Sequence, residues 1–124
     1  MKTKFIYLIL MASILSQTNC AAQALYLQWA VSFKGSGSSV GTSLAVNSNG
    51  DVYTTGSFND TVDFDPGPGI YNVISPDTTY GDCFVSKLTA AGNFGNAYWI
   101  GGMGAQDIGY GIATDPQNNV YTGG

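Results

Sequence analysis

The residues best suited to chemistry gather in one short stretch, where Asp60, Asp63 and Asp65 precede a Pro-Gly turn. From Asp63 to Gly67 the spacing is D-x-D-x-G, and alternate carboxylates beside a glycine turn can converge on calcium. Residues two apart in a strand share a face, so Asp63 and Asp65 are candidate calcium ligands. The chain has no Glu, so the bidentate ligand of an EF-hand is missing. The alternative is that Asp65 opens the turn and Asp63 is a solvated strand residue.

The sequence predicts no catalytic residues and no cofactor other than this calcium ion. Glycoside hydrolysis needs two carboxyl groups about 5–10 Å apart, and aspartates are available for it. The chain has no His, Glu or Arg, however, to complete the common acid–base or nucleophile sets. The other aspartates precede strands or open turns, where hydrogen bonds to the backbone explain them: Asp51, Asp82, Asp107 and Asp115.

A repeat indicates the elements that position these residues. Residues 43–56 recur as residues 111–124, and each copy has two apolar runs joined by a turn. The differences exchange residues that suit the same turn position: Asn47 with Asp115, Ser48 with Pro116, and Gly50 with Asn118. The last of these positions favours left-handed backbone, which Gly adopts freely and Asn better than most residues. Each copy is therefore predicted to be a β-hairpin.

The composition predicts an all-β fold, because turn formers are frequent and no apolar pattern of helical period runs for any length. Breaks are expected at Asn59-Asp60, at the Pro-Gly stretch 65–69 and at the turn 89–92, where Gly92 favours left-handed backbone. Strands are expected near residues 25–33, 42–47, 51–58, 61–64, 70–74, 83–88 and 93–100, with the last hairpin beginning at about residue 108.

Residues 1–24 have the pattern of a secretory signal peptide. A start containing two lysines precedes the apolar run 5–15, and small residues allow cleavage after Ala22 or Ala24. The run is too short to cross a bilayer core of about 30 Å, so no membrane span is expected. The protein is predicted to be secreted, outside the cell or at its surface. The alternative, lipidation of Cys20, fits poorly because polar residues precede that cysteine.

Removal of the signal peptide would leave an acidic chain. Lys34 and Lys87 would face eight aspartates, a formal charge of −6, with no basic patch. Phosphate backbones and anionic membranes would be repelled, so nucleic-acid binding is excluded. Cys83 would be the single remaining cysteine, and it is expected to be a small buried hydrophobic residue. The alternative is a reactive or intermolecular thiol, although no His or Arg lies near it in the sequence.

The motifs together resemble a known family. They are Trp29-Ala30, 43–46, 50–58, 61–67, 82–88 and 92–94. The combination resembles the β-propeller repeat of bacterial secreted proteins, the seven-bladed-propeller (SBBP) repeat. The resemblance implies antiparallel propeller blades, with residues 25–98 as a first repeat that includes an N-terminal strand and residues 99–124 as the truncated start of a second. A bulge or a small insertion is expected at 95–98, where the chain departs from the family pattern.

A closed propeller takes roughly 4–8 blades, so the chain is expected to be a fragment whose first partners are further blades. Residues 25–29 are expected to pair with the last blade. The predicted function is a non-catalytic binding or structural module with an unspecified protein or glycan partner. The alternative is a secreted hydrolase, for example one acting on glycans, with catalytic residues elsewhere. Aromatic residues are expected to pack between blades, or to stack on sugars where exposed: Tyr26, Trp29, Tyr53, Phe58, Phe64, Tyr71, Tyr80, Tyr98 and Trp99.

Overall fold

The computed structural model describes residues 26–77 and 79–124, so the predicted signal peptide lies outside the described residues. Within the described part the chain forms no helix, and hence none that could cross a membrane. It forms nine strands: β1 (Lys34–Gly35), β2 (Ser39–Val46), β3 (Val52–Phe58), β4 (Thr61–Asp63), β5 (Asn72–Ile74), β6 (Asp82–Leu88), β7 (Phe94–Ile100), β8 (Gly111–Thr114) and β9 (Val120–Gly123).

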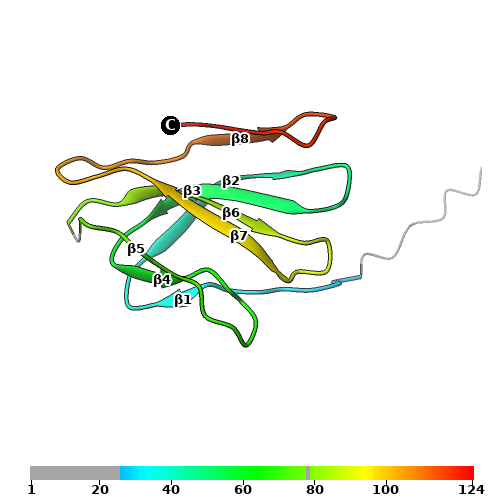
Figure 1. The fold of residues 1–124 in the computed structure, drawn as a ribbon, viewed down its shortest axis with the longest axis horizontal. Coiled ribbons are helices and arrows are strands. Elements are labelled where there is room, and N and C mark those ends of the chain that lie inside the picture. The colour runs from blue at the N-terminus through cyan, green and yellow to red at the C-terminus, as the bar shows by residue number, and fades with distance from the viewer. Residues whose placement is uncertain (1–25, 78) are drawn as a thin grey trace, which may run out of the picture.

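The strands lie in three layers (Figure 1). The middle layer is an antiparallel sheet with the order β2-β3-β6-β7, which is one four-stranded blade. On one side lies a small sheet with the order β1-β4-β5, and on the other side lies the hairpin β8–β9. The prediction of an all-β, antiparallel fold with one complete blade and the opening of a second is confirmed.

The two repeated hairpins have the same turn geometry. In the first, Gly50 donates its N–H to the carbonyl of Asn47 (3.0 Å), and in the second Asn118 donates to the carbonyl of Asp115 (2.9 Å). Both residues have left-handed backbone, with φ of 82° at Gly50 and 64° at Asn118. Gly92, in the turn between β6 and β7, has φ of 79°. The predictions of these turns are confirmed. They could be made from the sequence because the turns depend on local sequence alone.

A hydrogen-bonded pair of side chains, one Asn and one Asp, closes each repeated turn. The Asn comes first in the first turn and last in the second. The Oδ1 atom of Asn47 accepts the backbone N–H groups two and four residues later, and Oδ1 of Asp115 does the same in the second turn. The Nδ2 group of Asn47 donates to Asp51 (3.4 Å), whereas Nδ2 of Asn119 donates to Asp115 (2.8 Å). The amide and the carboxylate have exchanged positions between the two turns. Each turn still has one side-chain donor and one side-chain acceptor.

Backbone spacing at the far ends of the hairpins is also repeated. A Cβ atom on Gly56 would overlap the carbonyl oxygen of Val40, and one on Gly124 would overlap the carbonyl oxygen of Ile108. These two pairs occupy equivalent positions in the two copies. The glycines therefore allow the same close approach of two backbone segments in both units.

An aromatic cluster joins the blade to the small sheet. Phe64, which follows β4, lies 5.0 Å from Phe84 of β6 and 5.7 Å from Phe58 of β3, measured between ring centroids. All three rings are buried, and Phe33 packs 4.9 Å from Phe64. The core of the molecule thus lies between the middle layer and the sheet β1-β4-β5.

The strand expected at residues 25–33 is wrong, because the described residues 26–33 form no strand. Side chains anchor this segment instead: the indole N–H of Trp29 donates to the carbonyl of Ala90 (3.0 Å), and Phe33 enters the aromatic cluster. Only Lys34–Gly35 pairs, with β4. The pairing of residues 25–29 with another blade stays a prediction.

Other strand boundaries differ by a few residues from those expected. The strands expected at 61–64 and 70–74 are shorter, because Phe64 turns into the core and residues 65–71 form a loop. The second repeated hairpin begins at residue 111 rather than 108. The bulge expected at 95–98 is confirmed, since Lys87 pairs with Asn96 while Leu88 pairs with Phe94, which leaves Gly95 without a cross-strand partner.

Candidate binding groove

One wall of the candidate site is the Pro-Gly loop 65–69. Its shape is held by the two aspartates that the sequence singled out. Oδ1 of Asp63 accepts the backbone N–H groups of Asp65 (3.0 Å) and Tyr71 (2.8 Å), so it joins the two ends of the loop. Oδ1 of Asp65 accepts the N–H of Gly67 (2.8 Å) inside the loop. The loop is therefore closed by side-chain to backbone hydrogen bonds, as Asx residues often do in turns.

The opposite wall is the turn between β6 and β7 with the start of β7. Trp29 packs on this turn so closely that a Cβ atom on Gly92 would lie 2.8 Å from its ring. The ring of Phe94 lies 4.7 Å from that of Tyr71, and the hydroxyl of Tyr71 donates to the carbonyl of Ala97 (3.3 Å). These contacts fix the aromatic side of the wall.

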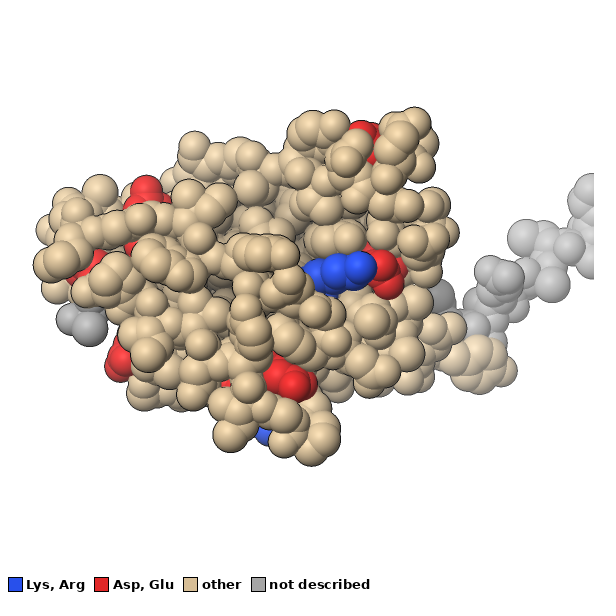
Figure 2. All heavy atoms as spheres, viewed as in Figure 1, with Lys and Arg blue, Asp and Glu red and all other residues tan. Residues whose placement is uncertain are grey.

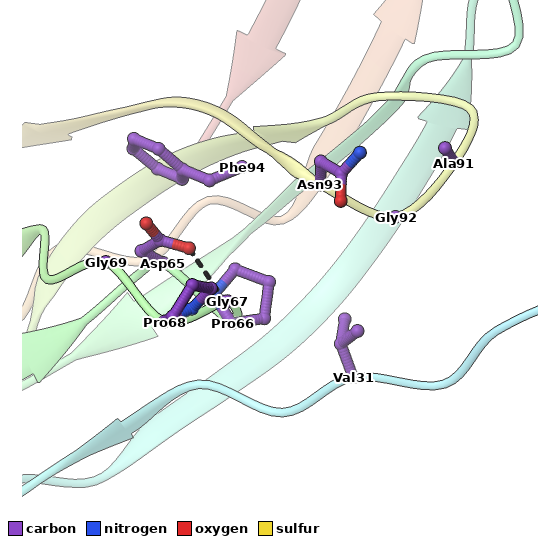
Figure 3. A pocket seen from close by; sticks show the side chains of 10 residues that line it. All are labelled: Val31, Asp65, Pro66, Gly67, Pro68, Gly69, Ala91, Gly92, Asn93 and Phe94. Atoms are coloured by element: carbon purple, nitrogen blue, oxygen red, sulfur yellow. Dashed lines mark hydrogen bonds between the residues drawn. The ribbon is translucent and has the colours of Figure 1, made fainter.

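Between the walls lies a groove of about 460 Å³. That volume is within the usual range of small-molecule sites, about 300–1,000 Å³. Figure 3 shows the ring of Phe94 beside the Asp65 carboxylate, with Asn93, Ala91 and Val31 toward the other end. The lining consists of Val31, Asp65, Pro66, Gly67, Pro68, Gly69, Ala91, Gly92, Asn93 and Phe94. The groove thus combines flat apolar groups with one carboxylate and one amide.

Acidic groups near the groove and elsewhere favour the charged state. The N–H groups of Tyr71 and Asp65 hold the pKa of Asp63 below its ordinary value. Elsewhere, the ion pair between Lys87 and Asp51 (2.8 Å) lowers the pKa of the carboxyl and raises the pKa of the amine.

The face drawn in Figure 2 is mostly uncharged, with acidic groups at separate places. A neutral or cationic ligand suits this surface better than an anion.

The lining of the groove contains a single acidic side chain. Asp65 is the one titratable residue in its lining, and the lining holds no Ser, Cys, Lys or Tyr to act as nucleophile or base. Hydrolysis of a glycoside normally uses two carboxyl groups that face each other. Asp82 and Asp107 do lie together against Gly101, but Asp82 is fully buried and cannot reach a sugar.

The candidate calcium ligands lie close to the groove. Asp63 and Asp65 each use Oδ1 in the loop, and the Oδ2 atom of each accepts no hydrogen bond from a described residue. Asp60 belongs to a different turn, with φ of 56°. Across residues 26–77 and 79–124, no group of three or more His, Cys, Asp or Glu is placed to hold a metal ion. Calcium at Asp63 and Asp65 stays a prediction.

The aromatic residues divide into a buried set, a half-buried set that includes Tyr53, and an exposed set. Phe58 and Phe64 are buried within the first unit rather than between units. Trp29 is half-buried against Gly92, also within the first unit. The exposed members are Tyr26, Tyr71, Tyr80, Tyr98 and Trp99. Tyr71 is the exposed aromatic residue that packs against the groove wall, through Phe94.

A second polar cluster was missed by the sequence interpretation, which placed Asp82 simply at a strand start. Asp82 is fully buried, accepts the hydroxyl of Ser75 and accepts the N–H of Gly102 (3.0 Å). Asp77 accepts the N–H of Gly104 (2.8 Å), which is the main reason that its pKa is lowered. The cluster ties the connection after β7 to the ends of β5 and β6. Its partners are distant in sequence, so no local pattern reveals it.

Cys83 is buried and free, beside the hydroxyl of Thr55 (3.7 Å). The expectation of a small buried residue is confirmed at this position. Thr55 is itself fully buried and donates to the carbonyl of Phe84 (2.8 Å). These two side chains form part of the surface on which the hairpin β8–β9 lies.

Comparison with known proteins identifies the end of the chain. Residues 97–124, from the middle of β7 through the hairpin β8–β9, match the family model of the SBBP β-propeller repeat. This stretch is similar to an SBBP repeat. The match confirms the resemblance seen in the sequence, and an SBBP repeat indicates a binding or structural module. No curated protein and no solved structure matches the chain.

Proposed function

We propose that this protein is a secreted, non-catalytic binding module that works outside the cell or at its surface, with the groove as its ligand site. The SBBP repeat at residues 97–124 is the observation that carries the proposal, because it supports a binding or structural module. The groove supports binding over catalysis, since its lining has one carboxylate and no second acid or nucleophile. Its apolar walls and its amide suit a protein segment or a glycan.

The groove can be tested with a fluorescence titration. Trp29 contacts Gly92 at the edge of the groove, so its emission should report a bound ligand. A Trp99→Phe background leaves Trp29 as the one tryptophan, because the chain has two. Oligosaccharides of neutral sugars and peptides would be titrated into the secreted protein. We expect a saturable change that Asn93→Ala abolishes.

Gln106→Ala provides the control, because Gln106 is exposed and does not line the groove. Binding that survives Asn93→Ala unchanged would place the ligand elsewhere. A secreted hydrolase is the competing function, and release of sugars from a glycan by the purified protein would support it.

Mass spectrometry of the protein in the medium tests secretion: a mature N-terminus after Ala22 or Ala24 is expected, and retention inside the cell contradicts it.

Calcium at Asp63 and Asp65 is a second element of the proposal. The Oδ2 atoms of both carboxylates, which accept no hydrogen bond from a described residue, support it, since calcium takes oxygen ligands. Calorimetry at millimolar calcium should show heat that Asp65→Asn reduces. Asp65→Asn keeps an oxygen to accept from Gly67, so the loop should persist. No heat above that of buffer would remove calcium from the proposal.

A further inference from the structure

The carboxylate of Asp65 folds over its own loop, where two glycines make room for it. A Cβ atom on Gly67 would lie 3.0 Å from Oδ1 of Asp65, and a Cβ atom on Gly69 would overlap Oδ2. Oδ1 accepts the N–H of Gly67, whereas Oδ2 accepts no hydrogen bond from a described residue. One oxygen therefore fixes the carboxylate in the groove, and the other can accept a hydrogen bond from a ligand.

The ring of Phe94 lies beside this carboxylate in the lining of the groove (Figure 3). Phe94 is half-buried, and Tyr71 packs against it with 4.7 Å between the ring centroids. The hydroxyl of Tyr71 donates to the carbonyl of Ala97, which helps to hold both rings in place. The face of an aromatic ring carries partial negative charge and attracts cations. The ring and the carboxylate thus offer two attractions to one positive group.

No basic side chain of the described part of the chain supplies this positive group. Of the two lysines there, Lys87 is paired with Asp51 (2.8 Å). Lys34 lies on β1 opposite Asp63 and does not belong to the lining of the groove. Two lysines against eight aspartates also give the chain after the predicted signal peptide a formal charge of −6, which attracts cations from a distance. A positive group at this place would come from the ligand.

The chemistry of the groove favours arginine as this positive group. A guanidinium is planar, stacks on aromatic rings and is less strongly hydrated than the ammonium of lysine. A guanidinium stacked on Phe94 can also donate to Oδ2 of Asp65. The groove volume of about 460 Å³ leaves room for the neighbouring residues of a peptide. Pro66 and Pro68 give those residues an apolar wall, and the amide of Asn93 can pair with a peptide group.

We infer that the groove binds a peptide segment of a partner protein through an arginine, whose guanidinium stacks on Phe94 and donates to Oδ2 of Asp65. The inference rests on the proposed function of the groove and names its ligand. A bound ligand removes water from the carboxylate of Asp65, and this loss is offset by a positive ligand but not by a neutral sugar. Charge complementarity therefore favours a basic peptide over a glycan.

Titration of two peptides into the secreted protein tests the inference. The first is a blocked pentapeptide with one arginine between glycines. The second has citrulline in its place, which keeps the shape of arginine and lacks the charge. The protein carries Trp99→Phe so that Trp29 reports binding, and a chelator removes calcium that could occupy Asp65. We expect the arginine peptide to bind about tenfold more tightly than the citrulline peptide, as is usual for a hydrogen bond between charged groups.

Three variants separate the contributions. Asp65→Asn should bind both peptides equally, because the amide oxygen still accepts the N–H of Gly67 but the charge is gone. Phe94→Leu should weaken binding of the arginine peptide about threefold, the loss of one cation–π contact. Asp60→Asn is the matched control, since it removes the same charge from an aspartate outside the lining. It should keep the full preference for arginine.

Equal binding of the two peptides by the unsubstituted groove would overturn the inference. A preference for arginine that persists in Asp65→Asn, or that is lost equally in Asp60→Asn, would overturn it too. Saturable binding of a neutral oligosaccharide without binding of the arginine peptide would reject the basic ligand and leave the groove as a ligand site. If no peptide and no oligosaccharide changes the emission of Trp29, both the inference and the proposed function of the groove are wrong.

Discussion

Asp115 and Asn119 illustrate how one residue pair specifies a turn. The carboxylate accepts two backbone N–H groups and the amide of Asn119, while the first hairpin uses the same pair with amide and carboxylate exchanged. Both arrangements supply one donor and one acceptor between the side chains. The identity of each residue therefore matters less than the complementarity of the pair.

We expect Asn119→Asp to weaken the second hairpin, because two carboxylates would then face each other without a donor. The double variant Asp115→Asn with Asn119→Asp should restore it, since that pair reproduces the first hairpin. Hydrogen exchange of the backbone amide of Gln117, which donates to Asp115, would measure the effect. The single variant should exchange faster than wild type. An equally fast double variant would contradict the explanation.

The lowered pKa of Asp63 predicts that the free energy of unfolding depends on pH. The N–H groups of Tyr71 and Asp65 lower the pKa of this carboxyl below its ordinary value. A carboxyl with a lowered pKa stabilises the fold fully above the pKa of the unfolded chain. That contribution is lost as the pH falls through the lower, folded pKa.

Urea unfolding at neutral pH and again below pH about 4 would detect this loss, since unfolded Asp has a pKa of about 3.9. We expect Asp63→Asn to lose less stability on acidification than wild type. Asp60→Asn serves as the control, because Asn also tolerates the left-handed backbone at that position. Equal acid sensitivity of wild type and Asp63→Asn would show that the loop hydrogen bonds do not stabilise the fold.

At the scale of elements, the close approach at Gly56 sets a strict requirement on β3. A side chain there would overlap the carbonyl oxygen of Val40, so Gly56→Ala should cost about 1–3 kcal/mol of unfolding free energy, as overpacking usually does. Gly111→Ala is the control in β8, where the added Cβ would meet no heavy atom of a described residue within 4 Å apart from its chain neighbours. Urea unfolding of both variants makes the comparison. Equal costs would show that the approach relaxes easily.

The elements also show where sequence alone suffices. The turns at Gly50, Gly92 and Asn118 were predicted because left-handed backbone has a residue preference that acts locally. The expected strand at 25–33 was wrong because its apolar residues anchor as side chains, Trp29 on Ala90 and Phe33 in the aromatic cluster. Alternating apolar residues do not distinguish strand pairing from such anchoring.

The candidate site was predicted only in part for the same reason. The spacing of Asp63 and Asp65 indicated a candidate site, and both residues do shape one wall of the groove. The other wall comes from the turn after β6, about 25 residues later, and the buried Asp82 depends on Ser75 and Gly102. Contacts between segments far apart in the chain leave no local pattern in a single sequence.

At the scale of the whole molecule, one aromatic cluster joins the blade to the small sheet. Phe84 is buried and lies within 6.5 Å of Phe33, Phe58 and Phe64, measured between ring centroids. Phe84→Ala should cost about 3–5 kcal/mol, as is usual for a buried ring. That is a large share of a typical folding free energy of about 5–15 kcal/mol.

Calorimetric or urea unfolding would measure this loss, with Phe84→Leu as a milder substitution that keeps the fold. We expect both substitutions to lower stability, and Phe84→Ala to lower it more. If the two layers unfold in separate steps after Phe84→Ala, the cluster is the main connection between them. A loss below about 1 kcal/mol would instead mean that the layers hold together without this ring.

The reversed Asn–Asp pair also constrains how one hairpin could have changed into the other. Two substitutions separate the pair Asn47–Asp51 from the pair Asp115–Asn119, and they can occur in two orders. One order passes through two aspartates, which have no donor and repel each other. The other passes through two asparagines, where each amide can still donate or accept. Divergence of duplicated units therefore has one easy route, by way of Asn–Asn.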